Sequence, residues 1–261
     1  MSTRVALVTG AGRGIGAATV HTLARQGWSV LAVDVATDIP ALPYPMASRK
    51  ELHHVASEAG PAVRPFTADV RDTAALEAAV AEAEAEWGGL DAAIACAGVI
   101  AGGVPLWRMP PDEERAVLDV CLGGVLNLAR AAIPALLRRP LPRRGRFLAV
   151  SSAAATRGLP MLAAYCAAKS GVAGLVRALG TELGDTGVTA NAVSPGSTDT
   201  PILEESARLY GLTGAASFAE QQPMGRLLDS AEVAAVLAFL AGPASSGMTG
   251  AVVPVDAGLA L

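Results

Sequence analysis

The chain has 261 residues, of which 52% are hydrophobic, 17% are charged and 4% are aromatic, and its formal net charge is −4. This length fits one large α/β domain, and the high apolar content excludes a disordered chain. The acidic balance, with arginines clustered only around Pro140 and Pro142, argues against a protein that binds nucleic acid.

Short apolar runs alternate with longer helical stretches along the chain. The apolar runs predict strands at residues 4–10, 29–34, 62–68, 91–95, 146–151, 188–193 and 251–255. Helical spacing predicts helices at 14–26, 73–87, 112–137, 164–184 and 229–241. Strands that alternate with long helices imply right-handed crossovers and a parallel sheet. We therefore predict a doubly wound, Rossmann-like α/β fold of about seven strands, with helices on both faces, as a single domain over residues 1–261.

Two segments interrupt this alternation. Residues 36–60 are long for a crossover; their first half is rich in proline, and their second half is predicted to be helical from Ser48. Residues 195–225 form the other long connection, which we interpret as the substrate loop. Long loops in a compact domain are usually lids or binding loops. The large apolar residues of the second segment favour an apolar substrate: Ile202, Leu203, Leu209, Tyr210 and Phe218.

A glycine-rich turn follows the first predicted strand and opens the first predicted helix. Glycine lets the backbone approach a pyrophosphate closely, and a helix N-terminus offers free N–H groups and a positive dipole. The turn therefore predicts a dinucleotide site, and the alternative is a tight turn that binds nothing. The residues expected to bind are Gly10, Gly12, Arg13, Gly14, Ile15 and Gly16.

Acidic residues end the second and third predicted strands. Asp34 can accept hydrogen bonds from both hydroxyls of an adenosine ribose and would repel a 2′-phosphate, and no arginine directly follows it. We therefore predict NAD rather than NADP, the alternative being a surface aspartate at a strand end. Asp69 and Val70 are expected at the same sheet edge, facing the adenine.

A tyrosine and a lysine stand four residues apart on the helix predicted at 164–184. Tyr165 and Lys169 share one helical face, and an ammonium nearby lowers the pKa of a tyrosine toward a useful acid or base. Ser151 and Ser152 close the strand upstream, which places a hydroxyl beside the phenol. The Tyr-x-x-x-Lys pattern is common by itself, and it is the preceding serines that favour a catalytic site.

Together these motifs resemble the short-chain dehydrogenase/reductase family over the full chain. The matching pieces are T-G-x-x-x-G-x-G at 9–16, Asp69-Val70, Cys96-Ala97-Gly98, Ser152, Tyr165, Lys169, "NAVSPGSTDT" at 191–200 and "VDAG" at 255–258. The family moves a hydride between a nicotinamide and an alcohol or carbonyl. The resemblance implies that Tyr165 is the catalytic acid/base, that Ser152 orients the substrate oxygen, and that Lys169 holds the nicotinamide ribose. It implies further cofactor contacts at Cys96, Ala97, Gly98, Pro195, Gly196, Thr198 and Thr200.

Two positions depart from the family pattern. Ala95-Cys96-Ala97-Gly98 stands in place of Asn-Asn-Ala-Gly, and Cys121 stands where the family places an asparagine, its fourth catalytic residue. That asparagine helps to hold a water that relays protons to the lysine. A thiol hydrogen-bonds poorly, but the backbone carbonyl at Cys121 remains available. Cys121 is either a small apolar filler or, less in keeping with a sequence that offers nothing to activate it, a nucleophile.

The segment after the second strand is similar to that of the mycofactocin-associated dehydrogenases, a branch that includes carveol-dehydrogenase-like proteins. That branch holds its nicotinamide without exchanging it and passes electrons to a peptide-derived redox carrier. The resemblance therefore implies a mycofactocin partner, and the wider family resemblance implies a homotetramer built on the helices at 112–137 and 164–184.

The cysteine pattern and the N-terminus indicate the compartment. Cys96, Cys121 and Cys166 are widely spaced, which argues against a metal module or a disulfide framework and fits a reducing compartment. The N-terminus carries no signal-peptide pattern, and no stretch has the length needed to span a bilayer. We expect a cytoplasmic protein with no metal and no membrane contact.

The function predicted from the sequence is an NAD-dependent oxidoreductase acting on an apolar secondary alcohol or its ketone. The alternative is a nucleotide-binding sensor or structural protein without turnover. The change at Cys121 motivates that alternative, whereas the intact Ser152, Tyr165 and Lys169 argue against it.

Overall fold

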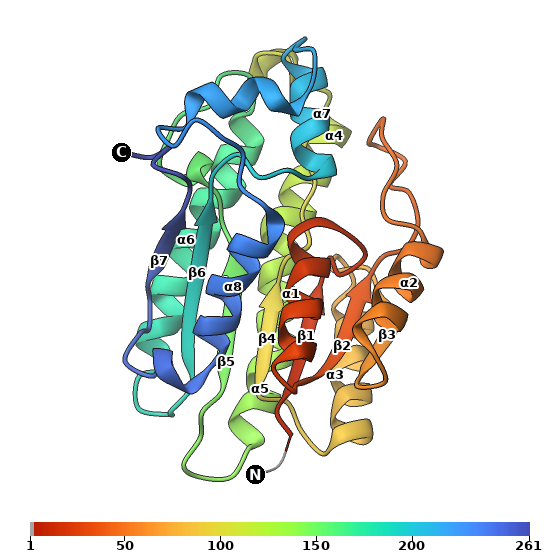
Figure 1. Cartoon of the computed structure of the whole chain (residues 1–261), viewed down its shortest axis with the longest axis vertical. Helices are drawn as coiled ribbons and strands as arrows, with labels where there is room; N and C mark the ends of the chain where they lie inside the picture. The colour runs from red at the N-terminus through yellow and green to blue at the C-terminus, as the bar shows by residue number, and fades with distance from the viewer. Residues whose placement is uncertain (1–2) are drawn as a thin grey trace.

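Seven parallel strands form one sheet in the computed structural model, which describes residues 3–261 (Figure 1). The order across the sheet is β3-β2-β1-β4-β5-β6-β7. All seven predicted strands are confirmed, with small differences at their ends. The strands are β1 (Val5–Thr9), β2 (Ser29–Asp34), β3 (Val63–Thr67), β4 (Ala92–Ala95), β5 (Arg146–Val150), β6 (Thr189–Pro195) and β7 (Val252–Val255).

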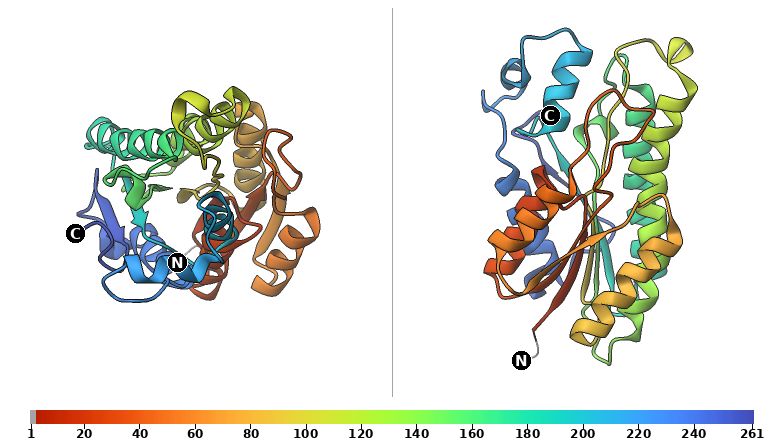
Figure 2. Two further views of the ribbon diagram at one scale, coloured as in Figure 1. Left: turned by 90° about the horizontal axis from the view of Figure 1, so that it is seen from above. Right: turned by 90° about the vertical axis from the view of Figure 1, so that its right-hand side faces the viewer.

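Helices cover both faces of the sheet, as the doubly wound fold requires (Figure 2). One layer contains α1, α2 and α8, and the other contains α3, α4, α5 and α6. α7 stands apart, above the carboxyl ends of the strands (Figure 1). The helices are α1 (Gly14–Arg25), α2 (Arg49–Ala59), α3 (Thr73–Trp87), α4 (Pro111–Leu118), α5 (Gly124–Arg138), α6 (Ala163–Glu182), α7 (Pro201–Leu209) and α8 (Ser230–Ala241).

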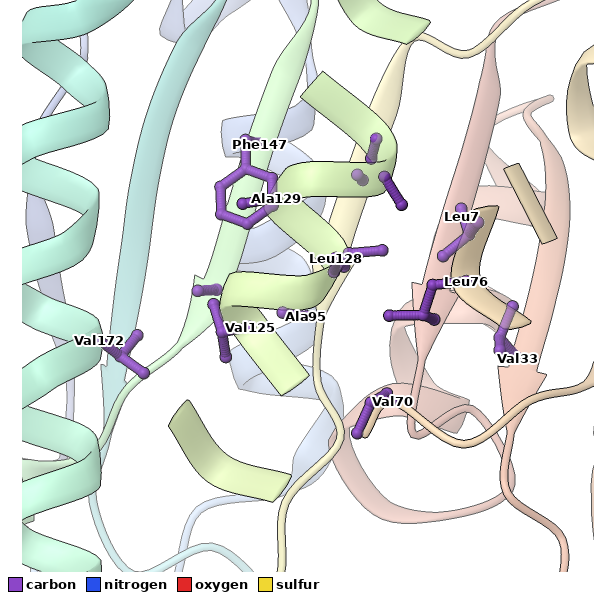
Figure 3. Packing of buried hydrophobic residues seen from close by; sticks show 14 of the residues in the cluster. Leu7, Val33, Val70, Leu76, Ala95, Val125, Leu128, Ala129, Phe147 and Val172 are labelled. Carbon is purple, nitrogen blue, oxygen red and sulfur yellow. The ribbon is translucent and has the colours of Figure 1, made fainter. Parts of the chain in front are cut away.

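The hydrophobic core consists of two clusters, one on each face of the sheet. In the first, Leu7 and Phe147 point from the strands toward Leu76 of α3 and Leu128 of α5 (Figure 3). The central strands are therefore buried on both sides. This explains why they appear in the sequence as continuous apolar runs rather than as alternating patterns.

The strand order reverses between β1 and β4, which places a crevice at the carboxyl edge of the sheet. β1 pairs with β2 on one side and with β4 on the other. The connections that follow these strands diverge to opposite sides, and ligands of open α/β sheets bind in the crevice that results.

The insertion after β2 is shorter than the residues 36–60 that the sequence indicated, because the second half of that segment is a regular helix. Ser48 caps α2, and its side chain and that of Glu51 form a reciprocal capping box. Residues 49–59 are thus an ordinary crossover helix, and the insertion narrows to residues 35–48, called the excursion below. The excursion rises above the sheet edge between β2 and α2 (Figure 1).

The long connection at residues 195–225 is partly helical, since it contains α7 and a 3₁₀ helix, Ala215–Gln221. Thr200 caps α7, with its hydroxyl accepting from the Leu203 N–H, and Pro201 occupies the first helical position. Proline is favoured at that position, because its missing N–H has no partner in the first turn of a helix.

The helix predicted at 112–137 is one helical stretch with a wide turn inside it. Between α4 and α5, residues Asp119–Gly123 form a π-helical turn. By length and composition, the stretch Pro111–Arg138 is long and apolar enough to cross a membrane. However, 56% of its most apolar 18-residue segment is buried inside the protein, as in a core helix.

Candidate active site

A cavity of about 610 Å³ lies at the carboxyl edge of the sheet. Nearly all of the residues expected to bind cofactor or substrate line it, although they come from distant parts of the chain. Gly12 and Cys121 do not line it; each lies just behind its wall. The predicted residues on the wall are Gly10, Arg13, Gly14, Ile15, Gly16, Asp34, Asp69, Val70, Cys96, Ala97, Gly98, Ser152, Tyr165, Lys169, Pro195, Gly196, Thr198 and Thr200.

The turn after β1 is packed so closely that it requires glycine. Gly10 has a φ of +65°, and a Cβ on it would lie 2.7 Å from the backbone of Ala97. A Cβ on Gly16 would lie 1.9 Å from the Gly10 carbonyl oxygen. No side chain caps the N-terminus of α1, so its first N–H groups face the cavity rim without an internal partner. This geometry fits a pyrophosphate.

Asp34, the last residue of β2, is buried against the same glycine turn. Its Oδ2 accepts a hydrogen bond from the Gly12 N–H at 2.9 Å, and its Oδ1 accepts one from the Ala36 N–H at 3.3 Å. Burial raises the pKa of this carboxyl above its usual value, and these backbone hydrogen bonds act in the opposite direction. A carboxylate held in this way has lone pairs left for the hydroxyls of a ribose.

Asp69 and Val70 reach the cavity from the end of β3, but Asp69 is also engaged elsewhere. Its carboxylate forms an ion pair with Arg71, with Nε and Nη2 of the guanidinium both donating. That pairing holds the pKa of Asp69 below its usual range despite partial burial. Val70 is 7% exposed and packs against the backbone of Gly124 at the start of α5. These two residues therefore offer mainly an apolar surface and a fixed turn.

Ser152, Tyr165 and Lys169 lie together at the other end of the cavity. Lys169 is 3% exposed; its Nζ donates to the Val150 carbonyl at 2.9 Å and lies 5.6 Å from the centre of the Tyr165 ring. Ser151, the serine to which the family resemblance gave no role, donates its hydroxyl hydrogen to the Lys169 carbonyl at 2.9 Å. Ser151 thereby fixes α6 against the end of β5, whereas Ser152 lines the cavity and its hydroxyl accepts a hydrogen bond from the Ala154 N–H at 3.1 Å.

The expected lowering of the pKa of Tyr165 by Lys169 is not found. Burial raises the pKa of the Tyr165 phenol above its usual value, the thiol of Cys121 adds to the rise, and a hydrogen bond with Ser152 opposes it. The lysine ammonium faces the ring and is held by the Val150 carbonyl rather than by the phenol oxygen. In this arrangement the phenol is protonated at neutral pH.

Cys121 lies in the π-helical turn and is fully buried. The Val99 N–H donates to its sulfur at 3.3 Å, and its thiol donates to the Val99 carbonyl at 3.1 Å. A Cβ on Gly98 would lie 3.9 Å from this sulfur and 3.7 Å from Nζ of Lys169, so the thiol and the lysine both lie against Gly98. The thiol thus bonds both the N–H and the carbonyl of Val99, in the backbone that follows β4. Cys121 is therefore neither a simple apolar filler nor a nucleophile in this structure, but a side chain that holds the backbone.

This role gives a prediction for Cys121. A carboxamide also has an acceptor and a donor, so Cys121→Asn should keep turnover within about tenfold of the wild type. Cys121→Ala leaves both polar groups of Val99 unpartnered and should cost about 1–3 kcal/mol in the free energy of unfolding. Denaturant unfolding and steady-state rates of both variants provide the measurement. Equal stability of the alanine and wild-type proteins would contradict it.

The excursion contacts the cavity wall at three places. The hydroxyl of Tyr44 accepts a hydrogen bond from the Ile100 N–H at 2.9 Å, and the guanidinium of Arg13 donates to the Pro45 carbonyl. Ala47 packs directly against Gly12, since a Cβ on Gly12 would lie 2.6 Å from the methyl group of Ala47. The excursion therefore bridges the glycine turn and the backbone after β4.

Comparison with known proteins shows the family. A family model described as enoyl-(acyl carrier protein) reductase matches residues 10–260. The short-chain reductase protein NovJ from Streptomyces niveus is 39% identical over 97% of this chain and 93% of its own length. The chain belongs to the short-chain dehydrogenase/reductase family. Cis-4-hydroxycyclohexanecarboxylate dehydrogenase from Sinomonas cyclohexanicum is 35% identical over 98% of this chain and 96% of its own length.

The structural comparison agrees with this assignment. The crystal structure of carveol dehydrogenase from Mycobacterium avium, in complex with NAD, superimposes with a TM-score of 0.92, at 31% identity over 99% of this chain and 98% of that chain. The predicted fold class is thereby confirmed, and so is the prediction of an oxidoreductase of the short-chain dehydrogenase/reductase type. The likeness to carveol dehydrogenases is also confirmed at the level of fold and sequence.

Proposed function

We propose that this protein transfers a hydride between NAD and an apolar secondary alcohol or its ketone. The observation that carries the proposal is one continuous cavity, with Asp34 and the glycine turn at one end and Ser152, Tyr165 and Lys169 at the other. The prediction of NAD is confirmed by the comparisons, since carveol dehydrogenase from Mycobacterium avium was solved with this cofactor.

The residues at the reactive end suit proton transfer to or from a substrate oxygen. The nicotinamide, when bound, gives or accepts the hydride. Ser152 and Tyr165 both line the cavity and their hydroxyl groups are within hydrogen-bond reach of one another, so in our proposal a substrate oxygen accepts from both. Burial keeps the Tyr165 phenol protonated, which suits it to donate a proton to a carbonyl oxygen in the reductive direction. Lys169 supplies a positive charge beside it, fixed by Val150.

Apolar side chains surround the rest of this end of the cavity, which supports an apolar substrate. Ile202 and Leu203 come from α7, and the 3₁₀ helix that follows contributes Phe218. The relatives named above act on ring alcohols, carveol and a hydroxycyclohexanecarboxylate, by their names. A ring-bearing secondary alcohol of medium size is therefore the substrate class to test first.

Turnover is the direct test of this function. Purified protein is given a panel of cyclic secondary alcohols and an artificial electron acceptor, and loss of the alcohol is followed. Oxidation of at least one member is the expected result. Nucleotide binding without turnover of any alcohol or ketone would instead support the alternative of a sensor or structural protein.

Asp34 determines the choice between NAD and NADP in this proposal. Asp34→Ala removes an acceptor from the ribose and the charge that repels a 2′-phosphate, so NADH binding should weaken by about tenfold while NADPH binding strengthens. Titration of protein fluorescence with each nucleotide measures both. A wild-type protein that already prefers NADPH would contradict the proposed adenosine pocket.

The excursion supports the further proposal that the cofactor does not exchange and is reoxidised by a mycofactocin carrier. Ile39, Leu42 and Ala47 of the excursion are buried in the protein, and Tyr44 and Pro45 hydrogen-bond across it. A segment fixed on both sides of the cavity slows the release of a dinucleotide beneath it. Reoxidation of bound NADH by the oxidised carrier, which accepts the two electrons and becomes reduced, in the absence of free NAD, would test the partner.

We also propose a cytoplasmic homotetramer, as the family resemblance implies. Leu126 of α5 is half-buried and does not belong to either core cluster, which supports a contact at this helix. Light scattering coupled to gel filtration measures the assembly state.

A further inference from the structure

A buried glutamine, Gln222, joins the substrate loop to the backbone that follows β6. Gln222 is 2% exposed. Its Oε1 accepts a hydrogen bond from the Ser197 N–H at 2.8 Å, and its Nε2 donates to the Ser197 carbonyl at 3.2 Å. Nε2 also donates to the Arg226 carbonyl. One side chain thus satisfies both backbone polar groups of Ser197 and a third group from the chain beyond it.

Only a carboxamide can make this set of bonds. The Ser197 N–H donates, whereas the carbonyls of Ser197 and Arg226 accept, and a glutamine side chain offers one carbonyl and two N–H donors. The Ser197 carbonyl also accepts from the Leu228 N–H at 3.0 Å. A glutamate would place a carboxylate oxygen against two carbonyl oxygens. The fit also depends on the neighbouring glycine, because a Cβ on Gly196 would lie 2.3 Å from the Gln222 Oε1.

The backbone held in this way forms the cavity wall at the reactive end. Pro195, Gly196, Ser197 and Thr198 all line the cavity, and Gln222 does not. β6, which leads into them, is the neighbour of β5, and β5 leads to Ser152. Gln222 follows directly on the 3₁₀ helix that carries Phe218 and Gln221 into the cavity. It therefore stands behind the wall, between the part facing the cofactor and the part facing the substrate.

We propose that Gln222 is a positioning residue that fixes residues 195–198 for the nicotinamide half of the dinucleotide. The same side chain makes the substrate loop and this wall one unit. The inference rests on the proposed function, since it takes NAD as the ligand. It predicts that loss of the carboxamide weakens contacts with the nicotinamide half and spares the adenosine half, which lies with Asp34 and the glycine turn at the far end of the cavity.

The test compares NADH with ADP-ribose, which has the adenosine and pyrophosphate but no nicotinamide. Both are titrated into nucleotide-free wild-type protein and Gln222→Met, which keeps the side-chain length and loses all three hydrogen bonds. The dissociation constant for NADH should rise by about tenfold, and that for ADP-ribose should stay within about twofold. Gln222→Glu, which keeps only the acceptor for the Ser197 N–H, should behave like Gln222→Met.

Hydrogen exchange in the absence of nucleotide supplies a readout that does not depend on the cofactor. Peptides covering residues 195–200 should exchange faster in Gln222→Met, and peptides covering the glycine turn should not. Gln26→Met, the same substitution at the exposed end of α1, is the matched control and should change neither binding nor exchange.

The outcomes separate this inference from the proposed function. Equal weakening of NADH and ADP-ribose binding, or unchanged NADH binding with unchanged exchange at 195–200, would overturn the role of Gln222. Wild-type protein that binds neither nucleotide would overturn the proposed function, and the assignment of Gln222 to the nicotinamide half with it.

Discussion

Tyr165→Phe should lower turnover by about 10²–10⁴-fold, because the phenol is the group placed to exchange a proton with the substrate oxygen. The ring remains and continues to pack beside Lys169, so NADH binding should be nearly unchanged. Single-turnover rates and a fluorescence titration of NADH measure the two effects separately.

Tyr210→Phe is the matched comparison for this variant. Tyr210 lines the same cavity, but its hydroxyl already donates to the Pro160 carbonyl at 2.7 Å. Its loss should raise KM for the alcohol more than it lowers kcat. If Tyr165→Phe kept near-native turnover, the assignment of the proton-transfer group would be wrong.

Tyr44→Ala should release the cofactor. We expect wild-type protein to carry nicotinamide nucleotide through gel filtration, held beneath the excursion. Removal of the Tyr44 ring and of its hydrogen bond with Ile100 costs about 2–4 kcal/mol of packing and hydrogen bonding. If these interactions hold the excursion over the bound cofactor, their loss should accelerate dissociation by about 30–1,000-fold. Stopped-flow displacement of bound NADH measures the rate.

A point variant is preferable to deletion of the whole excursion. Ile39, Leu42 and Ala47 are buried, so a deletion would also open the core of the protein. Tyr44→Phe keeps the ring and loses only the acceptor for the Ile100 N–H, and should accelerate dissociation less than Tyr44→Ala. Wild-type protein that elutes empty and exchanges NAD within seconds would contradict both the lid and the non-exchanging cofactor.

The sequence predicted those parts of the site that depend on local pattern. Buried parallel strands are continuous apolar runs, and the turn around Gly10 and Gly16 must be glycine because the chain approaches itself there. Tyr165 and Lys169 could be paired because helical spacing is fixed. Each of these signals lies within a few residues, so it can be seen without the fold.

The contacts that the sequence did not reveal join distant segments. Tyr44 with Ile100, Cys121 with Val99 and Gln222 with Ser197 are hydrogen bonds between a side chain and a backbone group. A backbone partner leaves no trace in residue identity, so these pairs have no signature in a single sequence. The raised pKa of Tyr165 was missed for a related reason: burial raises it, and burial depends on the whole fold.

The wide turn at Asp119–Gly123 changes the phase of the helical stretch that contains it. A π turn accommodates one more residue than an α turn, so the buried stripe of α5 is advanced by about 100° relative to an uninterrupted helix. Val117, Cys121 and Val125, which precede, lie in and follow this turn, are all buried. A chain one residue shorter here would restore a regular helix but rotate either Cys121 away from Val99 or the stripe of α5 away from the sheet. The extra residue is thus what allows one helix to pack against the core and hold the active-site backbone at once.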